Sequence, residues 1–157
     1  MNIKIIDTKG IDQTAMRGDL EGYFDDSRTL IVLCSRFFDA PELAIQLLLR
    51  HAKEASAKDI VYKTIILVLP RPEEAIAMKD DTGMAVGDKE EGYELKREQT
   101  SVALNRLGLD GIPIHFFNAR EDREDEYEDL RKRLVDRIQQ LRSIYRNRVS
   151  DGRESRL

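Results

Sequence analysis

Apolar residues gather in short runs that are separated by segments with a helical repeat. The runs cover Ile3 to Ile6, Thr29 to Cys34, Thr64 to Leu69 and Ile112 to Phe117, and β-branched side chains dominate them. That length and composition are typical of buried strands. Because strands that alternate with helices form a parallel sheet with helices on its faces, the pattern predicts an α/β fold. We expect three layers, α/β/α, around a mainly parallel sheet of about four strands.

Three other stretches have helical patterns. The entry signal Asp39-Ala40-Pro41 introduces the mostly apolar segment PELAIQLLLRHAKEAS. A second helix is expected from roughly Tyr93 to Leu107, where Gly108 closes it. The last helix begins at about Asp125 and has apolar residues at steps of three and four along one face. These residues are Tyr127, Leu130, Leu134, Ile138, Leu141 and Tyr145.

The length of the chain suits one domain, which we place at residues 1–148. A polar segment, residues 149–157, follows it and is expected to be a disordered tail. Within the domain, the segment between Leu69 and Gly92 has two prolines and clustered acids. This composition predicts a long loop.

Composition argues against several classes of partner. Charged residues make up 36% of the chain but are mixed in sign, with a net charge of −4, as expected of a solvated surface. The basic residues of the last helix are balanced by acids upstream, so we do not expect a nucleic-acid partner. No apolar stretch approaches the roughly 20 residues that span a bilayer, and no signal-peptide layout opens the chain. The single cysteine excludes a disulfide framework, so we expect a reducing, cytoplasmic location.

The opening stretch IIDTKGID carries the main chemical signal. It places an aspartate, Asp7, at the end of a predicted strand and a glycine, Gly10, at the next turn. Ligands of open α/β sheets bind at that position. In nucleotide hydrolases the acid orients the water shell of magnesium, and the glycine N–H contacts the terminal phosphate. The structural alternative is a turn in which the aspartate caps the following segment.

The surroundings of this motif resemble the second half of a P-loop GTPase of the translation-factor-related class. The motif Asp7-Thr8-Lys9-Gly10 stands where that family has its DxxG switch, and IDQTAMRGDLEGYFDD and the apolar strand TLIVLCSRF follow it. Near the other end, IHFFNARED resembles the last strand and its loop. There Asn118-Ala119-Arg120 stands in place of the Ser-Ala-Lys that contacts guanine. The resemblance covers roughly residues 2–148.

The resemblance implies roles for these residues in a complete domain that uses Mg²⁺ and GTP or ATP. Asp7 would hold the metal through water, and Gly10 would sense the terminal phosphate. Thr8 and Lys9 would lie beside the nucleotide, and residues 11–26 would move as a switch. Residues 118–120, named above, would line the base end.

Two departures from the family change this expectation. The chain has no G-x-x-x-x-G-K-[ST] motif, whose backbone donors and lysine hold the phosphates. The family's Asn/Thr-Lys-x-Asp is replaced by Leu69-Pro70-Arg71-Pro72, which has no carboxylate for guanine. We therefore expect the chain alone to bind no nucleotide tightly and to be catalytically silent.

The same absence predicts how the chain assembles. In the family, the phosphate-loop strand lies between the switch strand and the next strand. A chain that begins on an inner strand therefore looks like the carboxyl part of a larger NTPase domain. We expect a homo-oligomer, a remodelled sheet or association with a missing N-terminal portion, and a protein partner is a further option.

Two other functional classes fit the same apolar pattern. The stretch DDSRTLIVLCSRFFDAPELA resembles the strand and helix of Toll/interleukin-receptor domains, in which a glutamate attacks or positions NAD. Glu42 would be that glutamate. The third interpretation is an α/β interaction module without catalysis.

Overall fold

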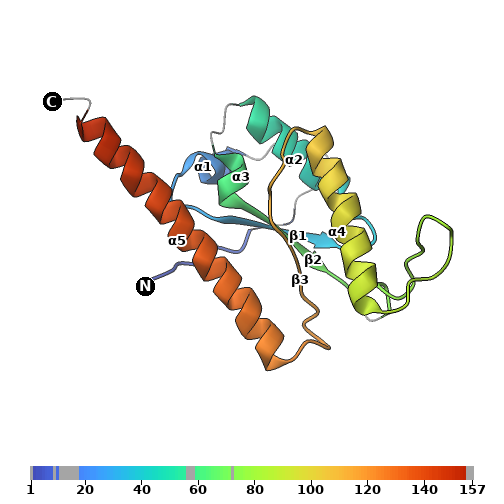
Figure 1. Ribbon diagram of the computed structural model, residues 1–157. Coiled ribbons are helices and arrows are strands. Elements are labelled where there is room, and N and C mark those ends of the chain that lie inside the picture. Colours follow the sequence, from blue (N-terminus) through green and yellow to red (C-terminus); the bar gives the residue numbers. More distant parts are fainter. Residues whose placement is uncertain (1, 9, 11–17, 56–58, 72, 155–157) are drawn as a thin grey trace.

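The structure is a computed structural model that describes residues 2–8, 10, 18–55, 59–71 and 73–154 (Figure 1). Three parallel strands form its sheet: β1 (Ile31–Arg36), β2 (Thr64–Leu69) and β3 (Ile114–Phe116), in the order β1-β2-β3. The register pairs Ile31 with Thr64 and Ile66 with Ile114. The predicted α/β class is confirmed, with three strands among the described residues where about four were expected.

Five helices accompany the sheet in the described part of the chain. They are α1 (Gly18–Asp25), α2 (Leu43–Glu54), α3 (Ile60–Lys63), α4 (Lys89–Arg106) and α5 (Glu124–Glu154). Crossovers through α2 with α3, and through α4, connect the strands and return the chain to the same end of the sheet, so successive strands are parallel neighbours. In Figure 1, α5 lies well apart from α4 and projects beyond the rest of the molecule.

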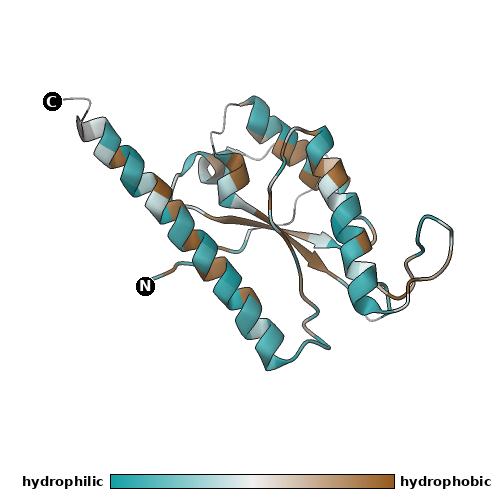
Figure 2. Ribbon diagram, in the orientation of Figure 1, coloured by the Kyte–Doolittle hydropathy of each residue, from teal (hydrophilic) through white to brown (hydrophobic). Residues whose placement is uncertain are grey.

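The main core lies between one face of the sheet and the helices α2 and α4. Ile66 and Val68 of β2 are fully buried, and Leu49 of α2 and Leu104 of α4 belong to the same apolar cluster. Figure 2 shows the strands as predominantly apolar and the helices as apolar on one side. Alternate residues of a strand point to opposite faces, so the side chains of β1 at even positions point away from this core. They are exposed, whereas Leu33 and Ser35 are buried.

A buried lysine ties α1 to the start of β2. Lys63 is 1% exposed, and its Nζ donates to the carbonyl oxygens of Tyr23 at 3.1 Å, Asp26 at 2.6 Å and Phe24. The last carbonyls of a helix lack partners within the helix, so an ammonium group satisfies them and interacts favourably with the helix dipole. Burial lowers the pKa of Lys63, and nearby carboxylates, Asp26 first, partly oppose that shift.

The predicted strand at the start of the chain is wrong. Residues 2–8 are not part of the sheet, and Ile3, Ile5 and Ile6 are 42%, 89% and 49% exposed. The apolar pattern alone does not form a strand, because a strand also needs a neighbour with which its backbone can pair. The other predicted strands all exist, with β2 matching its predicted bounds and β3 shorter than expected.

Several boundaries also differ from the prediction. Helix α5 continues to Glu154, so the predicted tail is helical up to that residue. Helix α4 starts at Lys89 because the Asp88 carboxylate accepts a hydrogen bond of 2.8 Å from the Glu91 N–H. Helix α1 lies within the predicted switch stretch, where no helix was expected, and residues 11–17 of that stretch lie outside the described residues.

Candidate functional site

The carboxyl ends of the three parallel strands lie at one edge of the sheet, where open α/β folds bind ligands. The segments that leave this edge begin after Arg36, Leu69 and Phe116. The last of them contains the predicted base-end residues.

Hydrogen bonds between Arg36 and Glu42 connect the end of β1 to the start of α2. The Glu42 carboxylate accepts hydrogen bonds from the Arg36 Nε at 2.8 Å and from the Arg36 backbone N–H at 3.2 Å. The Arg36 guanidinium also forms an ion pair with Asp39 at 3.1 Å. These acids, Glu42 first, raise the pKa of Arg36. Glu42, the candidate NAD-processing residue, is therefore engaged in joining two elements of the fold.

At the end of β3, Asn118 organises a loop that closes on itself. Its side chain is 4% exposed; Oδ1 accepts from the Arg120 N–H at 3.1 Å, and Nδ2 donates to Glu121 at 3.2 Å. Its backbone N–H donates to the Asp122 carboxylate at 2.7 Å, and its carbonyl accepts from the Asp122 N–H at 2.9 Å. The polar atoms of the Asn118 side chain are thus used within the loop, so Asn118 shapes the loop and does not present its amide to a ligand.

The next two residues of this loop are exposed. Ala119 and Arg120 both lie at the surface. Within the described part of the chain, no hydrogen bond uses the Ala119 N–H and no ion pair involves Arg120. The loop therefore places two exposed residues, one of them an arginine, beside the carboxyl end of β3.

This loop is supported by three side chains for which the sequence predicted no role: Tyr93, Lys89 and Asp122. Tyr93 of α4 stacks on Phe116, with 4.7 Å between the ring centroids, and Lys89 of α4 lies 3.8 Å from the Asp122 carboxylate. Burial, followed by the charges of Asp122 and Glu121, raises the pKa of Tyr93 to about 12. The spacing of Asp122 four residues after Asn118 was the available signal, because short acidic side chains commonly close such turns.

Asp7 of the DxxG motif lies near Cys34 of β1. Asp7 is exposed and acts electrostatically on Cys34, whose pKa is raised first by desolvation and second by the Asp7 charge. Cys34 is close to the carboxyl end of β1. Thr8 and Gly10 are also exposed, and Lys9 lies outside the described residues. No hydrogen bond or ion pair among the described residues joins Asp7 to the loop of Asn118.

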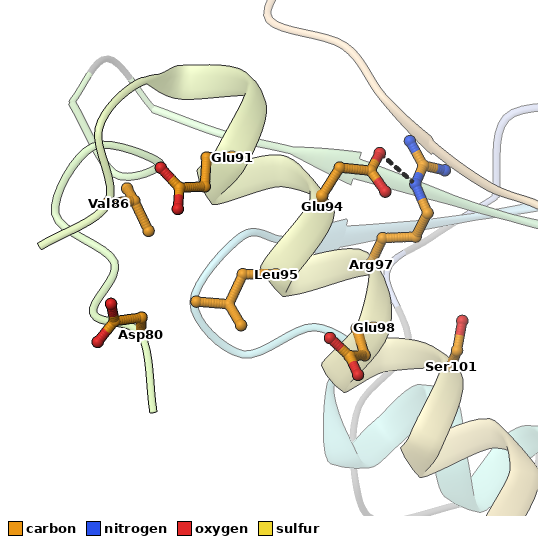
Figure 3. Close-up of a pocket in the computed structure, with 8 residues that line it drawn as sticks. All are labelled: Asp80, Val86, Glu91, Glu94, Leu95, Arg97, Glu98 and Ser101. Atoms are coloured by element: carbon orange, nitrogen blue, oxygen red, sulfur yellow. Dashed lines mark hydrogen bonds and ion pairs between the residues drawn. The ribbon is translucent and has the colours of Figure 1, made fainter. Parts of the chain in front are cut away.

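An open hollow of about 540 Å³ lies elsewhere, between α4 and the turn that precedes it (Figure 3). Its polar lining is mainly acidic, and most of these acids have partners. Asp80 accepts from Thr82 and Met84 within its own turn, and Glu94 pairs with Arg97 at 3.2 Å. The remaining lining residues are Val86, Glu91, Leu95, Glu98 and Ser101. The hollow includes none of the predicted site residues, and we do not assign it to the candidate site.

Comparisons with models of protein families, with curated proteins and with solved structures find no match for this chain. Among the described residues, no three or more His, Cys, Asp or Glu side chains gather as a possible metal site. A search of the same residues finds no helix with the length and apolar character that crossing a membrane requires.

Proposed function

We propose that this chain supplies the metal side and the base side of a P-loop GTPase-like domain, with the phosphate-binding loop supplied from outside the chain. The proposal starts from the DxxG motif and from the three later strands of the expected pattern, which form the sheet. Parallel strands in consecutive order, with Asp7 near β1 and the Asn118 loop at the end of β3, are compatible with it. By itself the chain lacks the phosphate-binding loop, whose donors hold the phosphates, and is catalytically silent.

The observation that carries the proposal is the loop after β3. The Asn118 side chain is hydrogen-bonded within the loop, and the next residue, Ala119, is exposed and its backbone N–H forms no hydrogen bond with another described residue. A fixed backbone donor suits the carbonyl oxygen of a purine base, because a donor held in place loses little conformational freedom when it binds. The exposed Arg120 adds a planar cation that can stack on the base.

In this proposal the DxxG segment acts at the other end of the nucleotide. The Asp7 carboxylate orients a magnesium ion through water, and the Gly10 N–H contacts the terminal phosphate. Both residues are exposed, as a role in contacting a ligand requires. Residues 18–25 of the switch stretch form α1, and Lys63 donates hydrogen bonds to the carbonyl groups at its end. A movement of this part of the switch would have to break those bonds or carry Lys63 with it.

Calorimetry with the purified chain tests the proposal. Titration with GTP and with ATP, each with magnesium, should give no binding at millimolar concentration, because the phosphate loop is absent from the chain. In parallel, the coding DNA that precedes the first codon is translated in frame and searched for G-x-x-x-x-G-K-[ST]. Firm binding to the chain alone would contradict the proposal, since the chain would then hold a phosphate site of its own. Upstream codons without the motif would contradict it as well.

A further inference from the structure

Strand β3 is the edge of the sheet opposite β1. The order β1-β2-β3 gives β3 one neighbour in the described part of the chain, β2. In Figure 1, β3 runs between α4 and α5. An edge strand presents N–H and C=O groups to which another chain can add a strand. The nucleotide site proposed above draws on β1 and on the loop after β3, and it leaves this edge unused.

The hydrogen bonds between β2 and β3 identify the outward groups of this edge. The Pro113 carbonyl accepts from the Ile66 N–H at 2.9 Å. The Phe117 N–H also donates to β2, at 3.1 Å, so the odd residues of β3 pair with β2. The N–H and C=O groups of the even residues, Ile114 and Phe116, therefore point away from β2.

Three of these four outward groups are open. The fourth, the Ile114 carbonyl, accepts a hydrogen bond from the guanidinium of Arg97, whose Nε pairs with Glu94 at 3.2 Å. Among the described residues, no hydrogen bond uses the Ile114 N–H or the N–H and carbonyl of Phe116. A strand that adds here therefore finds three free backbone groups and one that is already satisfied.

Positive charge surrounds the residue between these two, His115. Its pKa is lowered by burial first and then by the charges of Arg133 and Arg97, and Arg137 acts in the same direction. Asp129 opposes the shift, and this acid is already paired with Arg133 at 2.7 Å. Three arginines and one acid thus act on this position, from α4 and from α5. A negative charge beside His115 is therefore favoured.

The two arginines of α5 have capacity left for an acid. Arg137 donates to the Val61 carbonyl at 2.8 Å and to Gln140 at 3.2 Å, and its Nε is buried without a partner in the described part of the chain. No described carboxylate forms an ion pair with Arg137. Arg133 pairs through its Nε, which leaves its two Nη groups for another acceptor. The two side chains are neighbours on the helix surface, four residues apart.

We propose that an extended acidic segment of a partner protein adds to β3 as an antiparallel strand, with a glutamate or aspartate opposite His115. The residue before the acid then lies opposite Phe116 and exchanges two N–H···O bonds with it. The residue after the acid accepts from the Ile114 N–H, so all three open groups are satisfied. The acid points to the same face of the sheet as His115, where the charges of Arg133 and Arg137 act.

The backbone groups favour a peptide over a nucleic acid as the occupant. A strand supplies donors and acceptors to a sheet edge, whereas a phosphate backbone has no donor for the Phe116 carbonyl. The net charge of −4 also gives the chain no general attraction for polyanions. Because this edge lies across the sheet from β1, the partner site and the proposed nucleotide function can fail independently.

Fluorescence anisotropy with the full chain and a short labelled peptide tests the register. The peptide alternates threonine and valine around a central glutamate, and a second peptide has glutamine in that place. Loss of the charge should weaken binding about tenfold, because a charge-assisted hydrogen bond is lost. N-methylation of the residue before the glutamate should abolish binding, because it removes the N–H that reaches Phe116. N-methylation of the glutamate itself, whose N–H points away from β3, should not.

Substitutions in α5 test the charge. Arg133→Gln should remove the preference for glutamate over glutamine. Arg146→Gln is the matched control: it removes the same charge from an exposed position of the same helix and should leave the preference unchanged. A short single-stranded oligonucleotide should not displace the peptide. A glutamate peptide that does not bind, equal binding of the two peptides, the reverse pattern of N-methylation, or displacement by the oligonucleotide would each overturn the proposal.

Discussion

Gly92 marks the closest approach between α4 and the segment that precedes it. A Cβ atom built on Gly92 would lie 2.1 Å from the carbonyl oxygen of Ala75 and 2.7 Å from its carbon, whereas real Cβ contacts are longer than 3.0 Å. The Ala75 carbonyl also accepts a hydrogen bond of 3.3 Å from the Met78 N–H. Gly92→Ala therefore forces backbone atoms apart by roughly 1 Å and disturbs that bond.

The size of the effect follows from two opposing terms. Overpacking of this kind costs about 3 kcal/mol at the upper end of its range, and a shift of backbone belongs there. Alanine returns about 1 kcal/mol through its higher helix propensity. The net expectation is a loss of about 2 kcal/mol of unfolding free energy. For a chain of this length, that lowers Tm by about 4–8 °C.

Urea unfolding followed by circular dichroism measures this change, with Gly22→Ala as the matched control. Gly22 lies in α1, where an added Cβ would meet no atom within 4 Å. Its substitution should therefore stabilise the protein, by up to about 1 kcal/mol. If Gly92→Ala unfolds at the same or a higher urea concentration than the native chain, the close packing of α4 on Ala75 is wrong.

Further substitutions test buried polar groups. Lys63→Met leaves the carbonyls at the end of α1 without their ammonium partner and should cost about 2 kcal/mol in urea unfolding; a stability equal to that of the native chain would contradict the capping role. Burial first, and then the charges of Arg133 and Arg97, lower the pKa of His115 below its usual 6.5. The unfolded chain therefore takes up this proton first as the pH falls. The stability that neutral His115 contributes is fully present above pH 6.5. It is lost as the pH falls from 6.5 through the lowered pKa of the folded chain. As the pH falls across this range, the urea midpoint should fall less in His115→Gln than in the native chain. An equal fall in both would refute the contribution of neutral His115 to stability.

The strands show what an apolar pattern can and cannot predict. Residues 64–69 form the central strand β2, and the prediction matched because a strand with neighbours on both sides is apolar along its whole length. Ile3 to Ile6 have a similar composition but do not belong to the sheet. Composition reports that a segment is suited to a strand, whereas pairing depends on which segment lies beside it.

Helix α4 began earlier than predicted although its signal was in the sequence. Asp88 accepts from the Glu91 N–H at 2.8 Å, and the Glu91 carboxylate accepts from the Gly87 N–H at 2.6 Å. This reciprocal pattern resembles a capping box. Prolines, glycines and acids together are typical of loops, so the composition of this segment predicted a loop at these acids.

The place of Asn118 in the fold was predictable, but its contacts were not. The sequence placed Asn118 just after a strand, and that placement holds. The Asn118 side chain forms hydrogen bonds with Glu121 and with the Arg120 N–H. These bonds depend on how the backbone of the loop turns. The backbone of a turn is set by contacts that span several residues, so single positions in the sequence do not reveal it.

The central claim is that Asp7 and Ala119 serve one nucleotide site that a phosphate loop from outside this chain completes. The most direct test titrates GTP with magnesium into this chain extended by the residues encoded in frame before residue 1. The measurement is repeated with Asp7→Asn in the extended chain. The account predicts binding that requires the added residues and that Asp7→Asn weakens by about tenfold, or about 1.4 kcal/mol. An extended chain that binds no nucleotide, or that binds equally well with Asp7→Asn, would contradict it.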